Sequence, residues 1–315
     1  MTLLEVEELA VGVERSPHTL LRDVSFTVEP GEVMGLVGES GSGKTMASLA
    51  IMGLLPSGIE KRGGAVRLEG RDLIDPGTGN LNRTANEMTM IFQHPRSALN
   101  PTMRVGRQIA RVIEINQKVS GEAAREIALE ALSHVGIPGA KRVFRAYPHQ
   151  LSGGMCQRVM IAMALACRPR ILIADEPTTA LDVTIQAQIF DLINDLVEET
   201  GCGVLFITHD LGAIAEMCDQ VTVLYGGQVM ETGTLRDVFT QPLHPYTKFL
   251  FDAVEKEVDP RVDEKGVNFA LAGCRFGHRC PFVFEACGEF PPLRTVTTGH
   301  RSACFLHEEG PSGTA

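Results

Sequence analysis

The segment from Gly38 to Thr45, GESGSGKT, restricts the fold of this chain more than any other stretch. It fits the pattern G-x-x-x-x-G-K-S/T, in which glycines let backbone N–H groups turn inward around phosphate oxygens. An apolar run at residues 33–37 precedes this phosphate loop and a helical pattern follows it, as the motif requires. We therefore expect an α/β chain that binds ATP. The predicted phosphate contacts are Gly38, Ser40, Gly41, Ser42, Gly43, Lys44 and Thr45.

A second element of the same chemistry is ILIADE at residues 171–176. A short apolar strand would deliver Asp175 and Glu176 at its carboxyl end, where α/β sheets bind their ligands. We expect Asp175 and the Thr45 hydroxyl to bind Mg²⁺, and Glu176 to orient and polarise the attacking water. The Lys44 ammonium would contact the β and γ phosphates, which makes the expected reaction ATP hydrolysis.

The segment LSGGMCQR, residues 151–158, predicts a second anion site. Ser152 stands at an N-cap position, and Gly153 and Gly154 begin an apolar helix whose first N–H groups would be exposed. Because the phosphate loop already supplies one site, a second on another helix indicates that this segment completes the nucleotide of a partner chain. The alternative is an ordinary capped helix, which Ser152, Gly153 and Gly154 on their own would favour.

Together, these segments resemble the ATP-binding cassette (ABC) ATPases over roughly residues 1–250. Gln93 in IFQHP, Ala180–Leu181–Asp182 and His209 in ITHD extend the resemblance in the family's order. The resemblance implies that two cassettes stack head to tail around two ATP molecules, with Asp182 on the dimer seam. It further implies catalytic roles for Glu176, His209 and Gln93, Mg²⁺ contacts from Thr45, Gln93 and Asp175, and nucleotide contacts from Ser152, Gly153, Gly154 and Gln157.

The implied fold is a P-loop NTPase core of the RecA-like type with an antiparallel β subdomain and a helical signature insertion at about residues 92–166. Strands are expected at residues 3–8, 20–29, 33–37, 65–74, 171–174 and 204–207, helices at 45–55, 107–115, 121–135 and 154–166, and a hairpin at 221–229. After about Gln241 the composition shifts toward Pro, Gly and Cys. We expect a cassette domain at 1–240 and a small extension at 241–315.

Four of the eight cysteines, Cys274, Cys280, Cys287 and Cys304, crowd into that extension. Clustered thiols of a cytosolic protein favour metal over disulfides. The close C-x₂₋₄-C pairs of most structural zinc sites are absent from this spacing. A 4Fe–4S cluster, which some relatives carry, is the first expectation. Zinc, or no metal at all, stays open, and His278, His300 and His307 lie near enough to complicate the ligand choice.

Several stretches narrow the resemblance to oligopeptide, dipeptide and nickel importers: FQHPRSALNP, YPHQLSGGMCQR, DEPTTALDVTIQAQI and HPYTKFL. The resemblance implies a second, different ATPase subunit, two membrane permeases and an extracytoplasmic substrate-binding protein. Peptides are the first choice of cargo, and nickel or a metal chelate the alternative. No stretch is apolar enough to span a bilayer and the amino terminus is unlike a signal peptide, so a peripheral place on the cytoplasmic face of the membrane is expected.

Three further features of the sequence bear on its function. The net charge of −10 argues against nucleic acid as the main partner. The single phosphate loop and the short interval between Lys44 and Asp175 argue against a soluble, non-transport ABC ATPase, which remains a remote alternative. ABC cassettes usually stack adenine on an aromatic side chain, but Val11 to Val13 offer none and His18 is a poor substitute. We therefore expect the phosphates, rather than the base, to carry most of the recognition.

Overall fold

The computed structural model describes residues 2–73, 87–179, 181–255 and 273–307. The chain divides into two compact units, both discontinuous in sequence. The first unit comprises residues 29–32 and 83–207, and the second comprises residues 2–28, 33–82 and 208–315.

The first unit contains parallel strands followed by helices. Its strands pair side by side, with Met88 opposite Ile171 and Ile171 opposite Gly203. Every residue of the two later strands is buried, which is typical of parallel strands covered on both faces. The elements are β6 (Met88–Ile91), α2 (Pro95–Ala98), α3 (Val105–Gln117), α4 (Gly121–His134), α5 (Ala140–Arg145), η2 (Pro148–Gln150), α6 (Gly153–Leu165), β7 (Ile171–Asp175), α7 (Val183–Thr200) and β8 (Gly203–Ile207).

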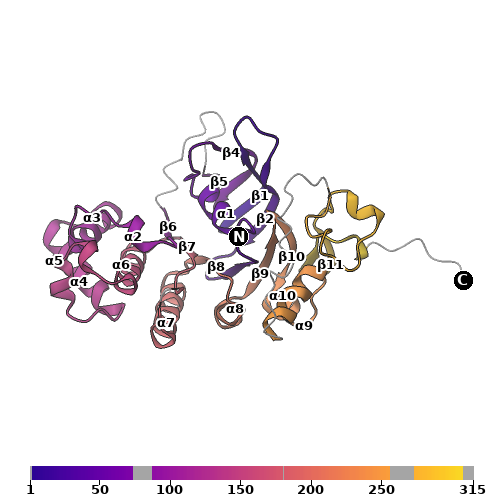
Figure 1. The fold of residues 1–315 in the computed structure, drawn as a ribbon. Helices are drawn as coiled ribbons and strands as arrows, with labels where there is room; N and C mark the ends of the chain where they lie inside the picture. Colours follow the sequence, from indigo (N-terminus) through magenta and orange to yellow (C-terminus); the bar gives the residue numbers. More distant parts are fainter. Residues whose placement is uncertain (1, 74–86, 180, 256–272, 308–315) are drawn as a thin grey trace, which may run out of the picture. The chain divides into compact units, whose positions relative to one another are not determined.

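Helices α3 to α6 form a group of their own, drawn in magenta tones in Figure 1. The three longer helices of this insertion are confirmed, because apolar residues at helical spacing are buried on each of them. The sequence pattern missed α5, which is too short to show a helical period. A Cβ on Gly106 in α3 would stand 2.2 Å from the Phe144 ring in α5. Glycine is therefore required for these two helices to pack.

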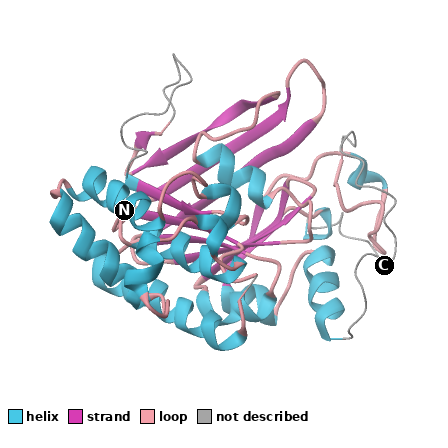
Figure 2. Ribbon diagram, turned by 60° about the vertical axis from the view of Figure 1, so that its left-hand side comes forward, coloured by secondary structure: helices cyan, strands magenta, loops and turns pink. Residues whose placement is uncertain are grey.

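The second unit holds an antiparallel sheet in the order β2-β1-β4-β5 and strands in the order β11-β12-β10-β9-β3. Figure 2 shows the long strands of the antiparallel sheet in magenta. Strand β3, which precedes the phosphate loop, pairs in parallel with β9. The elements are β1 (Leu4–Val13), β2 (Thr19–Val28), β3 (Val33–Val37), α1 (Lys44–Ile51), β4 (Ile59–Leu68), β5 (Arg71–Asp72), α8 (Leu211–Met217), β9 (Gln220–Tyr225), β10 (Gln228–Thr234), α9 (Leu235–Thr240), α10 (Pro245–Glu255), η3 (Glu285–Gly288), β11 (Arg294–Thr297), β12 (His300–Ser302) and η4 (Phe305–His307).

Helix α1 ends earlier than the sequence pattern predicted. It stops at Ile51, four residues before Leu55, because Gly53 adopts a left-handed φ of 64°. The N–H of Leu54 donates to the Leu49 carbonyl at 2.8 Å and that of Gly53 to the Ala50 carbonyl at 3.2 Å. This pair of bonds is the Schellman arrangement that closes many helices, so Gly53 ends the helix.

The carboxyl-terminal region returns to the strands of the second unit. The hairpin expected at residues 221–229 is confirmed by the antiparallel pairing of β9 with β10. Strand β12 then pairs with β10, placing Ser302 opposite Glu231 and Arg301 opposite Thr232. The region after residue 240 is therefore part of the same compact unit as the phosphate loop. The boundary between 240 and 241 stays a prediction.

Candidate nucleotide site

The phosphate loop leaves the buried strand β3 at Gly38 and enters helix α1 at Lys44. Gly38 has a φ of 152°, and a Cβ there would stand 2.1 Å from the Leu224 carbonyl oxygen. Gly43 has a φ of 106°, and its Cβ would stand 2.8 Å from a methyl carbon of Leu21. Two of the predicted loop glycines are thus required by both backbone conformation and space.

Lys44 holds the loop in its curved form. Its side chain is buried, and the ammonium donates to the carbonyl of Gly38 at 2.7 Å, that of Glu39 at 3.0 Å and the hydroxyl of Ser42 at 3.4 Å. Ser40, Gly41 and Thr45 are exposed at the surface of the loop. A positive charge therefore lies beneath an exposed turn that opens onto a helix amino terminus.

The start of helix α1 adds the electrostatic part of an anion site. Its N-cap is Gly43, which has no side chain to satisfy the N–H groups of the first turn. Those groups carry the positive end of the helix dipole, and the first turn contains no acidic residue. The geometry around Gly43 and Lys44 is therefore that of a phosphate site.

In the first unit, Asp175 ends strand β7 and Glu176 follows it, and both side chains are buried. Glu176 adopts a left-handed φ of 52°, which is uncommon and strained for a residue with a Cβ. Its N–H donates to the Ile207 carbonyl at 2.8 Å, and its carboxylate accepts a bond from the Thr179 hydroxyl. Hydrogen bonds therefore hold both the backbone and the carboxylate of Glu176 at the strand end. Thr179 was not among the residues predicted for the site, although the threonines that follow Pro177 were a usable signal.

Ser152 is the N-cap of helix α6, and its hydroxyl accepts a bond from the Met155 N–H at 3.3 Å. Gly153 and Gly154 form the first turn, and a Cβ on Gly153 would meet nothing within 4 Å. The helix start is therefore open to a second molecule. Gln157, expected to contact nucleotide, is buried instead, and its amide donates to the Pro177 carbonyl at 2.7 Å. This hydrogen bond joins helix α6 to the segment that follows Glu176.

The remaining predicted residues lie in loops between elements. Gln93 is exposed two residues after β6, and His209 is exposed between β8 and α8. Asp182 is the N-cap of α7 and accepts a bond from the Ile185 N–H at 3.1 Å. His18, the candidate for stacking adenine, is exposed between β1 and β2. Ala180 lies outside the described residues.

The structure brings the four clustered cysteines to one pocket. Cys274, Cys280, Cys287 and Cys304 all line it, together with His244 and a set of apolar side chains. Burial, together with the nearness of the other three thiols, raises the pKa of Cys274 to about 11. Within the described part of the chain, however, no group of three or more His, Cys, Asp and Glu side chains is arranged to hold a metal ion. The expected iron–sulfur or zinc centre is therefore not supported.

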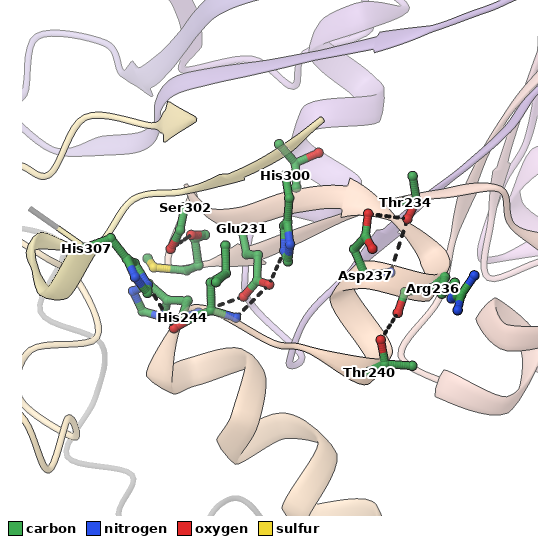
Figure 3. A network of polar contacts seen from close by, with 12 residues as sticks. Glu231, Thr234, Arg236, Asp237, Thr240, His244, His300, Ser302 and His307 are labelled. Atoms are coloured by element: carbon green, nitrogen blue, oxygen red, sulfur yellow. Dashed lines mark hydrogen bonds and ion pairs between the residues drawn. The ribbon is translucent and has the colours of Figure 1, made fainter. Parts of the chain in front are cut away.

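The segment before helix α10 is fixed by a buried carboxylate. Glu231 of β10 accepts bonds from the N–H groups of Leu243 and His244 at 2.9 and 2.8 Å, and from His300 Nε2 at 2.7 Å. Figure 3 shows this cluster and the position of His307 beside it. One carboxylate therefore joins β10, the approach to α10 and strand β12.

The helices of the described residues were also compared with the length and hydrophobicity of a membrane-spanning helix. None of them meets both requirements.

Comparison with known proteins identifies the class. The family described as "ABC transporter" matches residues 21–179, and the family described as "Oligopeptide/dipeptide transporter, C-terminal region" matches residues 230–287. A solved structure described as the ATP-binding subunit of an ABC transporter has a TM-score of 0.66 at 27% identity, over 81% of this chain and 100% of its own. A dimeric ATP-binding cassette bound to ADP and Pi has a TM-score of 0.65 at 27% identity, over 74% of this chain and 99% of its own.

The chain is therefore an ATP-hydrolysing cassette of the ABC transporter family, with the α/β P-loop NTPase fold expected from the sequence. Within that family it belongs to the group that carries the oligopeptide/dipeptide carboxyl-terminal region. It is 44% identical to the oligopeptide transport ATP-binding protein OppD of Salmonella typhimurium, over 96% of this chain and 93% of that protein. It is also 44% identical to the oligopeptide transport ATP-binding protein AppD of Bacillus subtilis, over 98% of both chains.

Proposed function

We propose that this chain is the energy-coupling ATPase subunit of an importer of oligopeptides or dipeptides. The observation that carries the proposal is the match of residues 230–287 to the carboxyl-terminal region of oligopeptide and dipeptide transporters. Relatives named as oligopeptide transport ATP-binding proteins support it, because they are similar along nearly the whole chain. That region also joins the strand that precedes the phosphate loop, because β10 pairs with β9 and β9 pairs with β3.

For ATP hydrolysis, we assign the phosphates to the loop from Gly38 to Thr45. Lys44 and the first N–H groups of α1 supply positive charge, and the exposed Thr45 hydroxyl is available to Mg²⁺. Asp175 and Gln93 would provide further oxygen ligands, which is the chemistry that Mg²⁺ prefers. Bound Mg²⁺ would neutralise charge on the phosphate oxygens.

Glu176 is the residue proposed to polarise the attacking water. Its carboxylate is held by Thr179 and its backbone by Ile207, so it does not need to be ordered when the nucleotide arrives. His209 would contact the γ-phosphate from the loop before α8. Hydrolysis would then depend on these residues of the chain together with the LSGGMCQR-like segment of a partner subunit.

The open start of α6, with Ser152, Gly153 and Gly154, would complete the nucleotide site of a second ATPase subunit, and the corresponding segment of that subunit would complete the site of this chain. We propose a heterodimer of two such subunits beneath two permeases, served by an extracytoplasmic substrate-binding protein. This places the chain on the cytoplasmic face of the cell membrane as a peripheral subunit. Gln157 would affect the nucleotide only indirectly, because its side chain is buried and its amide donates to the Pro177 carbonyl.

The decisive experiment is purification of the intact complex from its host membrane, followed by ATPase assays with candidate ligands. Co-purification of two permeases and a second ATPase subunit, with ATPase activity stimulated by di- and oligopeptides, is the expected result. Stimulation by nickel or a nickel chelate, and none by peptides, would replace the peptide assignment with the metal alternative. A complex without permeases would overturn the transport assignment.

For the cysteine pocket, we propose a 4Fe–4S cluster bound by Cys274, Cys280, Cys287 and Cys304, with a structural or redox-sensing role. The four thiols line one mostly apolar pocket, and such a cluster takes one thiolate at each iron. The thiolates of such a cluster stand farther apart than the ligands of a single ion. Among the described residues, no three or more His, Cys, Asp or Glu side chains are close enough to hold one ion, and this argues more against Zn²⁺ than against a cluster. Anaerobic purification with iron, sulfide and zinc analysis tests this. Protein free of iron and sulfide would contradict it.

A further inference from the structure

Glu39 is the one charged residue of the phosphate loop besides Lys44, and it is held on all sides. Its carbonyl oxygen accepts bonds from the Lys44 ammonium at 3.0 Å and the Ser42 N–H at 3.1 Å. Its N–H donates to the Tyr246 hydroxyl at 2.9 Å. Its carboxylate accepts a bond from the Arg279 guanidinium at 2.9 Å. Two of these contacts come from the carboxyl-terminal region, at 207 and 240 positions from Glu39 in the sequence.

The position of Tyr246 is set by a chain of buried polar groups. Glu231 accepts the His244 N–H at 2.8 Å, and Nδ1 of His244 accepts the Tyr246 N–H at 3.0 Å. Burial lowers the pKa of His244 to about 3, so Nδ1 is an acceptor at neutral pH. The Tyr246 side chain is fully buried, and the centre of its ring lies 4.6 Å from the centre of the Tyr225 ring. The Tyr246 hydroxyl that accepts the Glu39 N–H therefore lies on a segment held by buried hydrogen bonds.

Arg279 is equally constrained, by aromatic rings around its guanidinium. Its guanidinium lies 4.8 Å from the centre of the Phe249 ring and 5.8 Å from those of Tyr225 and Phe276. Only 13% of its side chain is exposed, and 19% of that of Glu39. Such an ion pair, enclosed by aromatic rings and partly withdrawn from water, is stronger than an exposed one.

The segment that carries Arg279 also carries two cysteines of the pocket. Consecutive turns join Gly277 to Cys274 at 3.0 Å, Arg279 to Phe276 at 2.9 Å and Cys280 to Gly277 at 3.3 Å. Phe276 of the same segment is buried among the rings of Tyr225, Tyr246 and Phe249. The folded state of the cysteine pocket and the position of Arg279 therefore depend on one another.

From these contacts we infer that the carboxyl-terminal region sets the affinity of the phosphate loop for ATP, with Tyr246 and Arg279 as positioning residues that act through Glu39. Tyr246 fixes the backbone N–H of Glu39 and thereby the course of the loop after Gly38. Arg279 compensates a carboxylate whose second oxygen is buried without a hydrogen-bond partner among the described residues. Without Arg279, that negative charge would oppose the charge of the phosphates. The inference rests on the proposed assignment of the loop as the ATP site.

The test is ATP affinity of the full-length chain, measured by equilibrium titration with a fluorescent ATP analogue. Arg279→Met is expected to weaken binding about tenfold, or about 1.4 kcal/mol. Adding Glu39→Gln to it removes the uncompensated charge and should restore most of the loss. Arg236→Met, at an exposed arginine of α9, is the matched control and should bind as the parent does. An unchanged affinity in Arg279→Met, or no recovery in the double variant, overturns the charge argument.

Tyr246→Phe tests the second contact and covers the case in which Arg279→Met does not fold. It removes the acceptor of the Glu39 N–H without changing charge. We expect about threefold weaker binding, corresponding to a modest neutral hydrogen bond, and no relief by Glu39→Gln. Parent-like affinity in Tyr246→Phe would exclude backbone positioning by this residue.

Lys44→Ala separates the inference from the assignment on which it rests. Loss of ATP binding in Lys44→Ala with parent-like binding in both Arg279→Met and Tyr246→Phe would refute the inference alone. Parent-like binding in Lys44→Ala would refute the proposed ATP site itself. The two failures are therefore distinguishable in one set of titrations.

Discussion

Replacing Glu231 by glutamine should release the segment that leads into helix α10. The Glu231 carboxylate is fully buried and accepts three hydrogen bonds, two at Oε1 and one at Oε2 (Figure 3). In Glu231→Gln, the amide oxygen can keep the two contacts made with Leu243 and His300. The amide nitrogen then faces the His244 N–H, so two donors meet where a donor met a charged acceptor.

The magnitude follows from the contact that is lost. A hydrogen bond to a charged group contributes about 1.5–3 kcal/mol, and a buried donor left unsatisfied adds a penalty of similar size. We therefore expect Glu231→Gln to weaken the local structure by about 3 kcal/mol. Alanine at Glu231 removes all three acceptor contacts and should cost about 5 kcal/mol.

Amide hydrogen exchange of Leu243 and His244 is the appropriate assay, because a chain of two units need not unfold in one step. A loss of about 3 kcal/mol corresponds to exchange faster by about two orders of magnitude. Glu216→Gln, at an exposed position of α8, is the control and should leave both amides protected. Exchange of the two amides in Glu231→Gln as slow as in Glu216→Gln would refute the proposal that the Glu231 carboxylate holds the segment before α10.

Three further predictions concern the nucleotide site and its supports. Glu176→Gln should bind ATP normally while turnover falls at least about 100-fold, as measured by phosphate release; near-normal turnover would exclude Glu176 as the base. Ser152→Arg should block hydrolysis in the assembled transporter yet leave ATP binding by the isolated chain intact, and loss of that binding would contradict the shared site. His244→Asn should flatten the pH dependence of stability between pH 6.5 and about 3. The buried imidazole has its pKa lowered to about 3, so its stabilisation is present above pH 6.5 and lost as protons bind the unfolded chain. A pH profile of urea unfolding identical to the parent's would show that His244 is not responsible.

Much of the fold followed from local patterns. The apolar runs before Gly38 and before Asp175 predicted buried strands, and both are fully buried. Helix ends did not follow as closely, because α1 ends at Ile51, at a Schellman turn made by Gly53, and not at Leu55. The burial of Gln157 could not be predicted from the sequence, since its contact with the Pro177 carbonyl joins two segments that no local pattern connects.

The sequence by itself determined the chemistry of the phosphate loop, because a contiguous run of glycines, Lys44 and Thr45 carries its own backbone geometry and charge. It also determined the family, through short motifs in a fixed order. Only the tertiary structure showed that Tyr246 and Arg279 converge on Glu39 from far along the chain. Such convergence depends on how strands pair and rings pack, and these long-range contacts leave no periodic trace in the sequence.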